Sequence, residues 1–375
     1  MTHEHTHDHD HGGCCGGHHH HDHHAAGPAE GRADLSGPAD AAIAVEVTRG
    51  GTVESLHRAH AVIVDAHGRV LARWGDADRP VFARSAIKAL QAIPLVETGA
   101  LDAFGLGTEE LALACSSHSG EAVHTELAAR WIVRIGCTVD DYECGAHLPY
   151  HEPTAHALHR RGEAPTAFHN NCSGKHAGFL TTARHKGEPL KGYVRYEHPV
   201  QQRILGVLEQ MTAQDLSQAP WGVDGCSIPT IAIPLGALAY AMARIADPHD
   251  LPDRRAEAVT RIRTAWGRHP LLIGGTGTFD TRLMTAAGGA VLVKGGAEGV
   301  GCAVLPEQGV GIALKVEDGA GRAREVALAA LLRAADALTA GQWATVPELL
   351  VEPITNRAGT RVGEVRPAKG WAAAK

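Results

Sequence analysis

The stretch Arg84-Ser85-Ala86-Ile87-Lys88-Ala89-Leu90-Gln91 places a serine and a lysine three residues apart at the expected start of a helix. Pro80-Val81-Phe82, just before it, is typical of extended chain. Apolar residues then recur at nearly helical spacing, namely Ile87, Leu90, Ile93 and Leu95. We therefore expect a helix over residues 85–98 with the serine in its first turn.

This spacing has a chemical meaning, because residues three apart share one face of a helix and the Lys88 amine can then reach the Ser85 hydroxyl. A serine hydroxyl is a weak nucleophile at neutral pH, and a neutral lysine can act as its base. A free lysine has a pKa of about 10.4, so burial or a second cation must disfavour the charged amine. Alone, the pair also fits a solvated lysine one turn after a capping serine.

The composition is that of a globular protein: 375 residues, 44% hydrophobic and 21% charged, with a net charge of −7. Lys and Arg are not clustered, so we expect no nucleic-acid partner. No apolar run is long enough for a membrane span and no signal peptide is visible, so we expect no membrane partner. A cytoplasmic protein follows, in which the eight cysteines are free thiols or metal ligands rather than disulfides.

Residues 1–40 differ in kind from the rest of the chain. Met1–His24 holds 11 of the 26 histidines, with Cys14-Cys15 between two pairs of glycines. Such a tract cannot bury a core, so we expect a disordered tail that binds additional divalent metal, with zinc, nickel and copper all open. A purification tag is the less favoured alternative, because other residues interrupt the histidine runs. Residues 25–40 read as a linker.

The remaining residues, 41–375, follow an α+β order of strands, helices, strands and a last helix. Strands are expected at 43–47, 60–64, 70–74, 290–294, 302–305 and 310–316, and helices at 85–98, 121–135, 176–186, 199–213, 234–246, 253–266 and 323–339. We expect an antiparallel sheet flanked by helices, built from about 41–80 and 275–375. A helical lobe should span about 81–274, with the active site between the two.

Three further stretches carry more reactive side chains than a core needs: Cys115-Ser116-Ser117-His118-Ser119-Gly120-Glu121, Asn171-Cys172-Ser173-Gly174-Lys175-His176-Ala177-Gly178 and Lys294-Gly295-Gly296. Ser85-x-x-Lys88, Ser117 and Lys294 follow the order of the three elements of penicillin-recognising serine hydrolases. There, one serine is acylated, a second relays the proton and a strand-end lysine lies opposite. The glycines after Lys294 would let a substrate backbone lie against the strand.

Together with Asp224-Gly225-Cys226-Ser227-Ile228-Pro229-Thr230, these motifs resemble the asparaginase II family of the Rhizobium-inducible type, through most of residues 42–365. The resemblance implies hydrolysis of L-asparagine to L-aspartate and ammonia, a fold similar to serine β-lactamases and glutaminases, and a homodimer. It also implies two Ser–Lys tandems, Ser85–Lys88 and Ser117–Lys294. Where a characterised type of member has a further cysteine near the site, this chain has Asp280.

Some members of that family hold zinc through two cysteines and a lysine, which correspond here to Cys172, Cys226 and Lys175. The residues themselves show no zinc-finger spacing, although two thiolates bind zinc well and a deprotonated lysine can complete the set. The alternative is two buried free cysteines beside a lysine that binds the substrate carboxylate.

In the mechanism we expect, neutral Lys88 takes the proton of Ser85, which attacks the side-chain amide carbon of asparagine. Ser117, hydrogen-bonded to Lys294, hands a proton to the departing ammonia, and water then hydrolyses the ester. The opposite assignment, with Ser117 as nucleophile and Lys294 as its base, stays open. Backbone N–H groups are expected to hold the oxyanion.

Arg84 is our candidate for the substrate α-carboxylate because a guanidinium binds it with two hydrogen bonds, and His118 and Glu121 are candidates for other polar contacts. Two rival functions stay open. One is a related Ser–Lys amidohydrolase acting on glutamine, a D-amino acid amide or a peptide. The other is a zinc-handling protein without amidase activity, in which the tail and the cysteine pair are the function.

Overall fold

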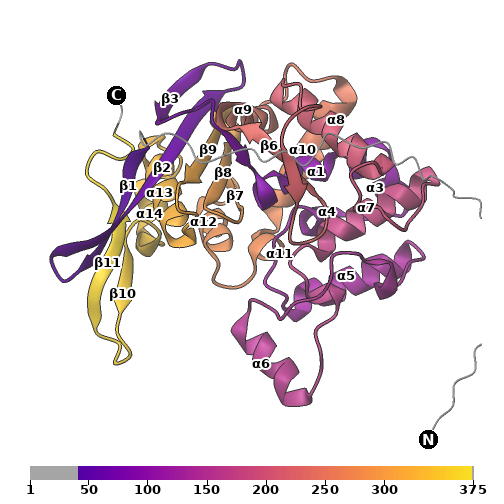
Figure 1. Ribbon diagram of the computed structural model, residues 1–375, viewed down its shortest axis with the longest axis horizontal. Helices are drawn as coiled ribbons and strands as arrows, with labels where there is room; N and C mark the ends of the chain where they lie inside the picture. The colour runs from indigo at the N-terminus through magenta and orange to yellow at the C-terminus, as the bar shows by residue number, and fades with distance from the viewer. Residues whose placement is uncertain (1–40, 374–375) are drawn as a thin grey trace, which may run out of the picture.

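The computed structural model describes residues 41–373, and the expected histidine-rich tail, residues 1–40, lies outside the described residues. A large antiparallel sheet consists of β1 (Ala42–Arg49), β2 (Thr52–Asp65), β3 (Val70–Trp74), β7 (Leu292–Gly295), β8 (Val300–Leu305), β9 (Val310–Val316), β10 (Glu352–Thr355) and β11 (Arg361–Pro367). Its order is β10-β11-β1-β2-β9-β8-β7, with β3 paired to β2 (Figure 1). Strands from both ends of the chain thus share one sheet, which confirms the α+β prediction.

Helices cover both faces of this sheet. A Cβ atom on Gly311 of β9 would lie 2.1 Å from the Ala239 carbonyl oxygen in α9 (Leu235–Ala246). A Cβ atom on Gly301 of β8 would lie 3.2 Å from Arg324 Cγ in α13 (Gly321–Ala334). Gly311 pairs with Val304, three residues after Gly301 in the same strand, so the two glycines face opposite sides of the sheet. The helices α9 and α13 therefore lie on opposite faces.

A mainly helical region lies beside the sheet (Figure 1). Its helices are α1 (Lys88–Gln91), α2 (Ile93–Glu97), α3 (Ala100–Ala103), α4 (Thr108–Ala114), α5 (Ala122–Arg134), α6 (Glu152–Arg161), α7 (Ser173–Lys186), α8 (Pro199–Thr212), α10 (Asp253–Arg268) and α11 (Pro270–Gly274). The short α12 (Phe279–Ala287) and α14 (Ala340–Ala344) lie toward the C-terminus. A second sheet of β4 (Pro80–Phe82), β6 (Pro229–Pro234) and β5 (Trp221–Val223) crosses this region in the order β4-β6-β5.

The long predicted helices are present within a few residues of the expected bounds, but the helix expected at 85–98 is broken. A 3-10 turn, Arg84–Ile87, leads into α1, and α2 follows as a separate short helix. Pro94 lies in the first turn of α2, where its missing N–H cannot bond to the carbonyl four residues earlier. The serine and lysine of the opening motif therefore lie in a tight turn and not on one regular helix.

Two other differences concern helix ends. The helix α7 begins at Ser173, three residues earlier than predicted, and is buried all round from Ser173 to Ala183, so no periodic pattern marks its start. The Gly274–Gly277 turn joins α11 to α12, where we expected a connection from helical lobe to sheet. The helix α9, counted by sequence with the helical lobe, packs on the main sheet.

No helix in the described part of the chain combines the length and apolar character needed to cross a membrane.

Candidate active site

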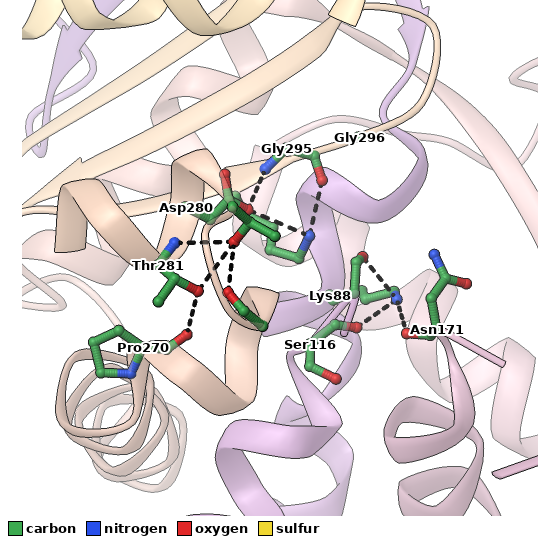
Figure 2. Close-up of polar contacts among 12 residues, drawn as sticks. Lys88, Ser116, Asn171, Pro270, Asp280, Thr281, Gly295 and Gly296 are labelled. Carbon is green, nitrogen blue, oxygen red and sulfur yellow. Dashed lines mark hydrogen bonds and ion pairs between the residues drawn. The ribbon is translucent and has the colours of Figure 1, made fainter. Parts of the chain in front are cut away.

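Lys88, the first residue of α1, is completely buried, and its amine is surrounded by oxygen atoms. The Nζ atom bonds to the carbonyl oxygens of Ser116 at 2.5 Å and Asn171 at 3.3 Å, and lies 3.0 Å from Ser117 Oγ (Figure 2). Burial lowers the pKa of Lys88, and the positive charge of Lys175 adds to this effect although the Cys172 and Cys226 sulfurs oppose it. The site thus favours a neutral amine.

Ser117 is held directly after α4, in the loop that follows Cys115. Its backbone N–H donates to the carbonyl oxygen of Ile273 at 2.9 Å, which ties this loop to α11. The side chain is partly exposed, so its hydroxyl lies between the buried Lys88 amine and the outside. Ser117 therefore has the position of a hydroxyl that can meet both a base and a substrate.

Ser85 is also partly exposed, and within residues 41–373 its hydroxyl has no hydrogen-bond partner. Its carbonyl oxygen accepts a hydrogen bond from the backbone N–H of Lys88, which closes the 3-10 turn. The amine of Lys88 contacts the hydroxyl of Ser117 and not that of Ser85. The expected tandem Ser85–Lys88 stays a prediction about the reacting state.

Lys294 lies at the end of β7 and is 2% exposed. Its Nζ donates to the carbonyl oxygen of Gly295 at 2.8 Å and lies 3.8 Å from Asp280 Oδ2. Burial lowers the pKa of Lys294 to about 7, Asp280 opposes this shift, and the cations Lys88 and Arg324 add to it. None of the hydrogen bonds of the described residues joins Lys294 to Ser117, so the expected tandem Ser117–Lys294 also stays a prediction.

Arg84 is oriented by a carboxylate from the other end of the helical region. Its Nε and Nη2 donate to Asp224 Oδ1 at 3.0 and 2.7 Å, and this hydrogen bond raises the pKa of Arg84. The backbone φ of Arg84 is +49°, a left-handed conformation that costs a non-glycine residue free energy and that is often found at functional sites. A substrate carboxylate would therefore meet a guanidinium that already has one anionic partner.

The three residues expected to hold zinc, Cys172, Lys175 and Cys226, come together next to Lys88. All three are buried, and Lys175 Nζ lies 3.1 Å from Cys226 Sγ. A hydrogen bond from Cys226 lowers the pKa of Cys172 well below its usual value and raises that of Cys226. Burial opposes protonation of Lys175, but the two sulfurs raise its pKa above its usual value.

This donor set fits a zinc ion by its chemistry, since two sulfurs and one nitrogen are ligands that zinc prefers once Lys175 has lost its proton. Residues 41–373 contain no group of three or more His, Cys, Asp or Glu side chains that could hold a metal, so the lysine nitrogen would have to be the third donor. The six cysteines in this part of the chain are free thiols, as expected.

The model of the family described as L-asparaginase II matches residues 45–367. The chain belongs to the L-asparaginase II family. Membership supports an amidohydrolase with a small-molecule substrate. A solved structure, a β-lactamase from Mycobacterium bovis, is 14% identical and covers 73% of this chain and 94% of that chain, with a TM-score of 0.39. So low a TM-score carries no argument about this protein. A comparison with curated proteins finds no match.

In this L-asparaginase II chain the two candidates for polar substrate contacts are already engaged. His118 is buried, with Nε2 2.8 Å from Ser173 Oγ and Nδ1 accepting the Gly120 N–H. Glu121 accepts hydrogen bonds from Ser119 Oγ and from the N–H and hydroxyl of Thr276, each at 2.7 Å. These bonds favour roles in holding the Ser117 loop, and substrate contact by either residue stays a prediction.

Three parts of the L-asparaginase II site could not be assigned from the sequence. The carbonyl oxygens of Ser116 and Asn171 are backbone acceptors, which no residue type reveals. Asp224 lies in a motif that we quoted, but its partner Arg84 is 140 residues away. The signal available for Asp224 was a carboxylate two residues before a candidate metal ligand, which gives no hint of an arginine.

Proposed function

We propose that the protein hydrolyses L-asparagine to L-aspartate and ammonia through a serine acyl-enzyme. Family membership supports an amidohydrolase, and the finer assignment depends mainly on one observation, the environment of the Lys88 amine. A neutral amine has two N–H groups and one lone pair. The carbonyls of Ser116 and Asn171 engage the two N–H groups, which leaves the lone pair to accept the proton of a serine hydroxyl.

The proposed reaction begins when Ser85 attacks the side-chain amide carbon of asparagine and its proton passes to Lys88. Ser117, 3.0 Å from the Lys88 amine, then relays that proton to the departing nitrogen, and the carbon–nitrogen bond breaks with release of ammonia. Water hydrolyses the β-aspartyl ester by the same route in reverse and regenerates Ser85. Backbone N–H groups beside Ser85 are suited to hold the oxyanion.

Arg84 is proposed to bind the substrate α-carboxylate, since its guanidinium adjoins Ser85 and Asp224 holds it in place. Cys172, Lys175 and Cys226 are proposed to hold zinc, which when bound supplies positive charge and Lewis acidity next to the site. The homodimer, the cytoplasmic location and the metal-binding role of residues 1–40 remain predictions of the sequence.

Ammonia release tests the function. The wild-type protein should release ammonia from L-asparagine faster than from L-glutamine, and the variants Ser85→Ala and Ser117→Ala should each lose most of this activity. Ser217→Ala, which changes an exposed serine, is the matched control. A variant that keeps near-normal turnover excludes its serine as nucleophile. No ammonia release from any amide, together with tight zinc binding, would favour the zinc-handling alternative.

The nucleophile is identified by trapping the ester. Acid quenching during turnover followed by peptide mass spectrometry should place an aspartyl group on the peptide that contains Ser85. An aspartyl group on Ser117 would reverse the two serine roles and make Lys88 the direct base of Ser117, to which it is already hydrogen-bonded.

A further inference from the structure

Asp280 lies where the end of β7, the helix α12 and the Lys294 side chain meet (Figure 2). It is the second residue of α12 and is 9% exposed. Its Oδ2 atom accepts the backbone N–H of Gly295 at 3.1 Å, and the same atom lies 3.8 Å from Lys294 Nζ. One carboxylate oxygen therefore holds both the strand end and the charge of the lysine.

The surroundings of Lys294 make this carboxylate necessary. A buried ammonium is costly unless an anion faces it. The strand register puts Lys294 opposite Cys302 and Gly295 opposite Gly301, so Lys294 lies on the face of the sheet away from α13. The guanidinium of Arg324 on α13 donates to the Gly296 carbonyl from the other face, which leaves a second cation close behind the strand.

The other titratable groups near Lys294 supply little negative charge. Burial raises the pKa of Cys115 and of Cys302 to about 12, so both thiols stay neutral at physiological pH. Lys88 and Arg324 are cations or potential cations, and Glu325 is ion-paired to Arg324. The groups that act on Lys294 are Asp280 from α12, Lys88 from α1, Arg324 from α13 and Cys172 from the start of α7. Among the described residues, Asp280 is the carboxylate paired with Lys294.

We propose that Asp280 is a positioning residue of the reaction, which fixes the end of β7 through the Gly295 N–H and keeps a proton on Lys294. Lys294 is then the charged amine of the site and can stabilise negative charge or help to protonate the departing nitrogen, in contrast to Lys88, which is held without a carboxylate. The catalytic part of this inference rests on the proposed function, whereas the ionisation of Lys294 can be measured without any activity.

Asp280→Asn tests the inference, because an asparagine oxygen can still accept the Gly295 N–H while the negative charge is lost. NMR of protein labelled with carbon-13 at lysine Cε follows the titration of Lys294, whose signal is identified by its loss in Lys294→Met. The expected midpoint is about 7 in the wild type. In Asp280→Asn it should fall by about 1 unit or more, because an anion within 4–6 Å favours a charged amine by that amount.

Kinetics supply the second readout. The alkaline limb of the pH dependence of kcat should move to lower pH in Asp280→Asn by the same amount as the Lys294 midpoint, with KM little changed. Asp280→Glu restores the charge and should bring the midpoint back toward the wild-type value. The control Asp102→Asn removes an exposed carboxylate that pairs with Arg261 on the surface, and should move neither readout.

An unchanged Lys294 midpoint in a folded Asp280→Asn protein overturns the inference, whatever the activity. A shifted midpoint with an unshifted kcat profile overturns the catalytic part. A shifted midpoint in a protein that releases no ammonia from any amide overturns the proposed function and leaves Asp280 as the group that sets the charge of Lys294.

Discussion

The two buried lysines of the site sit in opposite kinds of pocket. Lys88 is enclosed by backbone carbonyls and a serine hydroxyl, at the start of a helix that is itself buried. Lys294 lies at a strand end beside the carboxylate of Asp280. Both amines are nearly inaccessible to water, so burial favours the neutral form in each, but an anion opposes this effect for Lys294. Burial alone therefore does not decide the role of a lysine; the partners of the amine do.

The largest effect that separates the two pockets is expected from Lys88→Met, which keeps the length of the side chain and removes the base. Loss of a general base costs roughly 10²–10⁴ in rate, so kcat for L-asparagine should fall by that factor with the fold retained. Steady-state ammonia release and circular dichroism check the two parts. Near-normal kcat in Lys88→Met would show that Lys88 is not the base.

The second comparison concerns the walls of the pockets. A Cβ on Gly174, beside the Lys88 pocket, would lie 2.1 Å from the Leu113 carbonyl oxygen, which belongs to rigid backbone. A Cβ on Gly295, beside Lys294, would lie 2.4 Å from Arg324 Nη1, the movable end of a side chain. Gly174→Ala should thus destabilise the protein by about 3 kcal/mol or more and Gly295→Ala by less.

Urea unfolding measures both variants. Gly206→Ala is the matched control for Gly174→Ala, because it also lies within a helix and its added Cβ would meet nothing within 4 Å. It should stabilise the protein by up to about 1 kcal/mol. Equal losses for Gly174→Ala and Gly295→Ala would contradict the difference between a backbone wall and a side-chain wall.

The third test uses the pH dependence of stability. Lys294 titrates near 7 in the folded chain and near about 10.4 when unfolded, so between these values the unfolded state binds more protons. The free energy of unfolding contributed by this group therefore rises with pH in that window, by about 1.4 kcal/mol per unit, and is flat below the window. In Lys294→Met the slope should fall by that amount, as urea titrations at several pH values can show. An unchanged slope would mean that Lys294 is not shifted.

The smallest effect is expected at the entrance of the site, where Asp224 holds Arg84. Asp224→Asn keeps one hydrogen-bond acceptor but weakens the charge-assisted pair. KM for L-asparagine should change several-fold, because the guanidinium is less well placed, while kcat stays within a similar factor. A fall in kcat by orders of magnitude with constant KM would contradict a substrate-binding role for Arg84. Asp215→Asn, an exposed aspartate, is the control.

The strands and long helices could be predicted because their apolar residues repeat with a clear period, as in β9 and α10. The break after Gln91 could have been inferred from Pro94, whereas the start of α7 had no periodic signal because that helix is buried on every side. Family motifs brought Lys88, Ser117, Lys294 and the cysteine pair to attention.

The partners within the site could not be predicted. We argued for a Ser85–Lys88 contact from the geometry of a regular helix, but the chain forms a 3-10 turn there and the amine reaches Ser117, 29 residues further along. The pair Asp280–Lys294 likewise joins a helix start to a strand end. Such contacts depend on how separate elements pack, and one sequence carries no period or spacing that encodes them.

The central claim is that Lys88 is a free amine at the pH at which the protein works, and NMR with lysine labelled at Cε tests it most directly. The account predicts that the Lys88 signal, identified by its loss in Lys88→Met, already has the position of a neutral amine at neutral to slightly alkaline pH. The exposed Lys186 should still be fully charged in the same sample. A Lys88 signal that titrates together with that of Lys186, near about 10.4, would contradict the account.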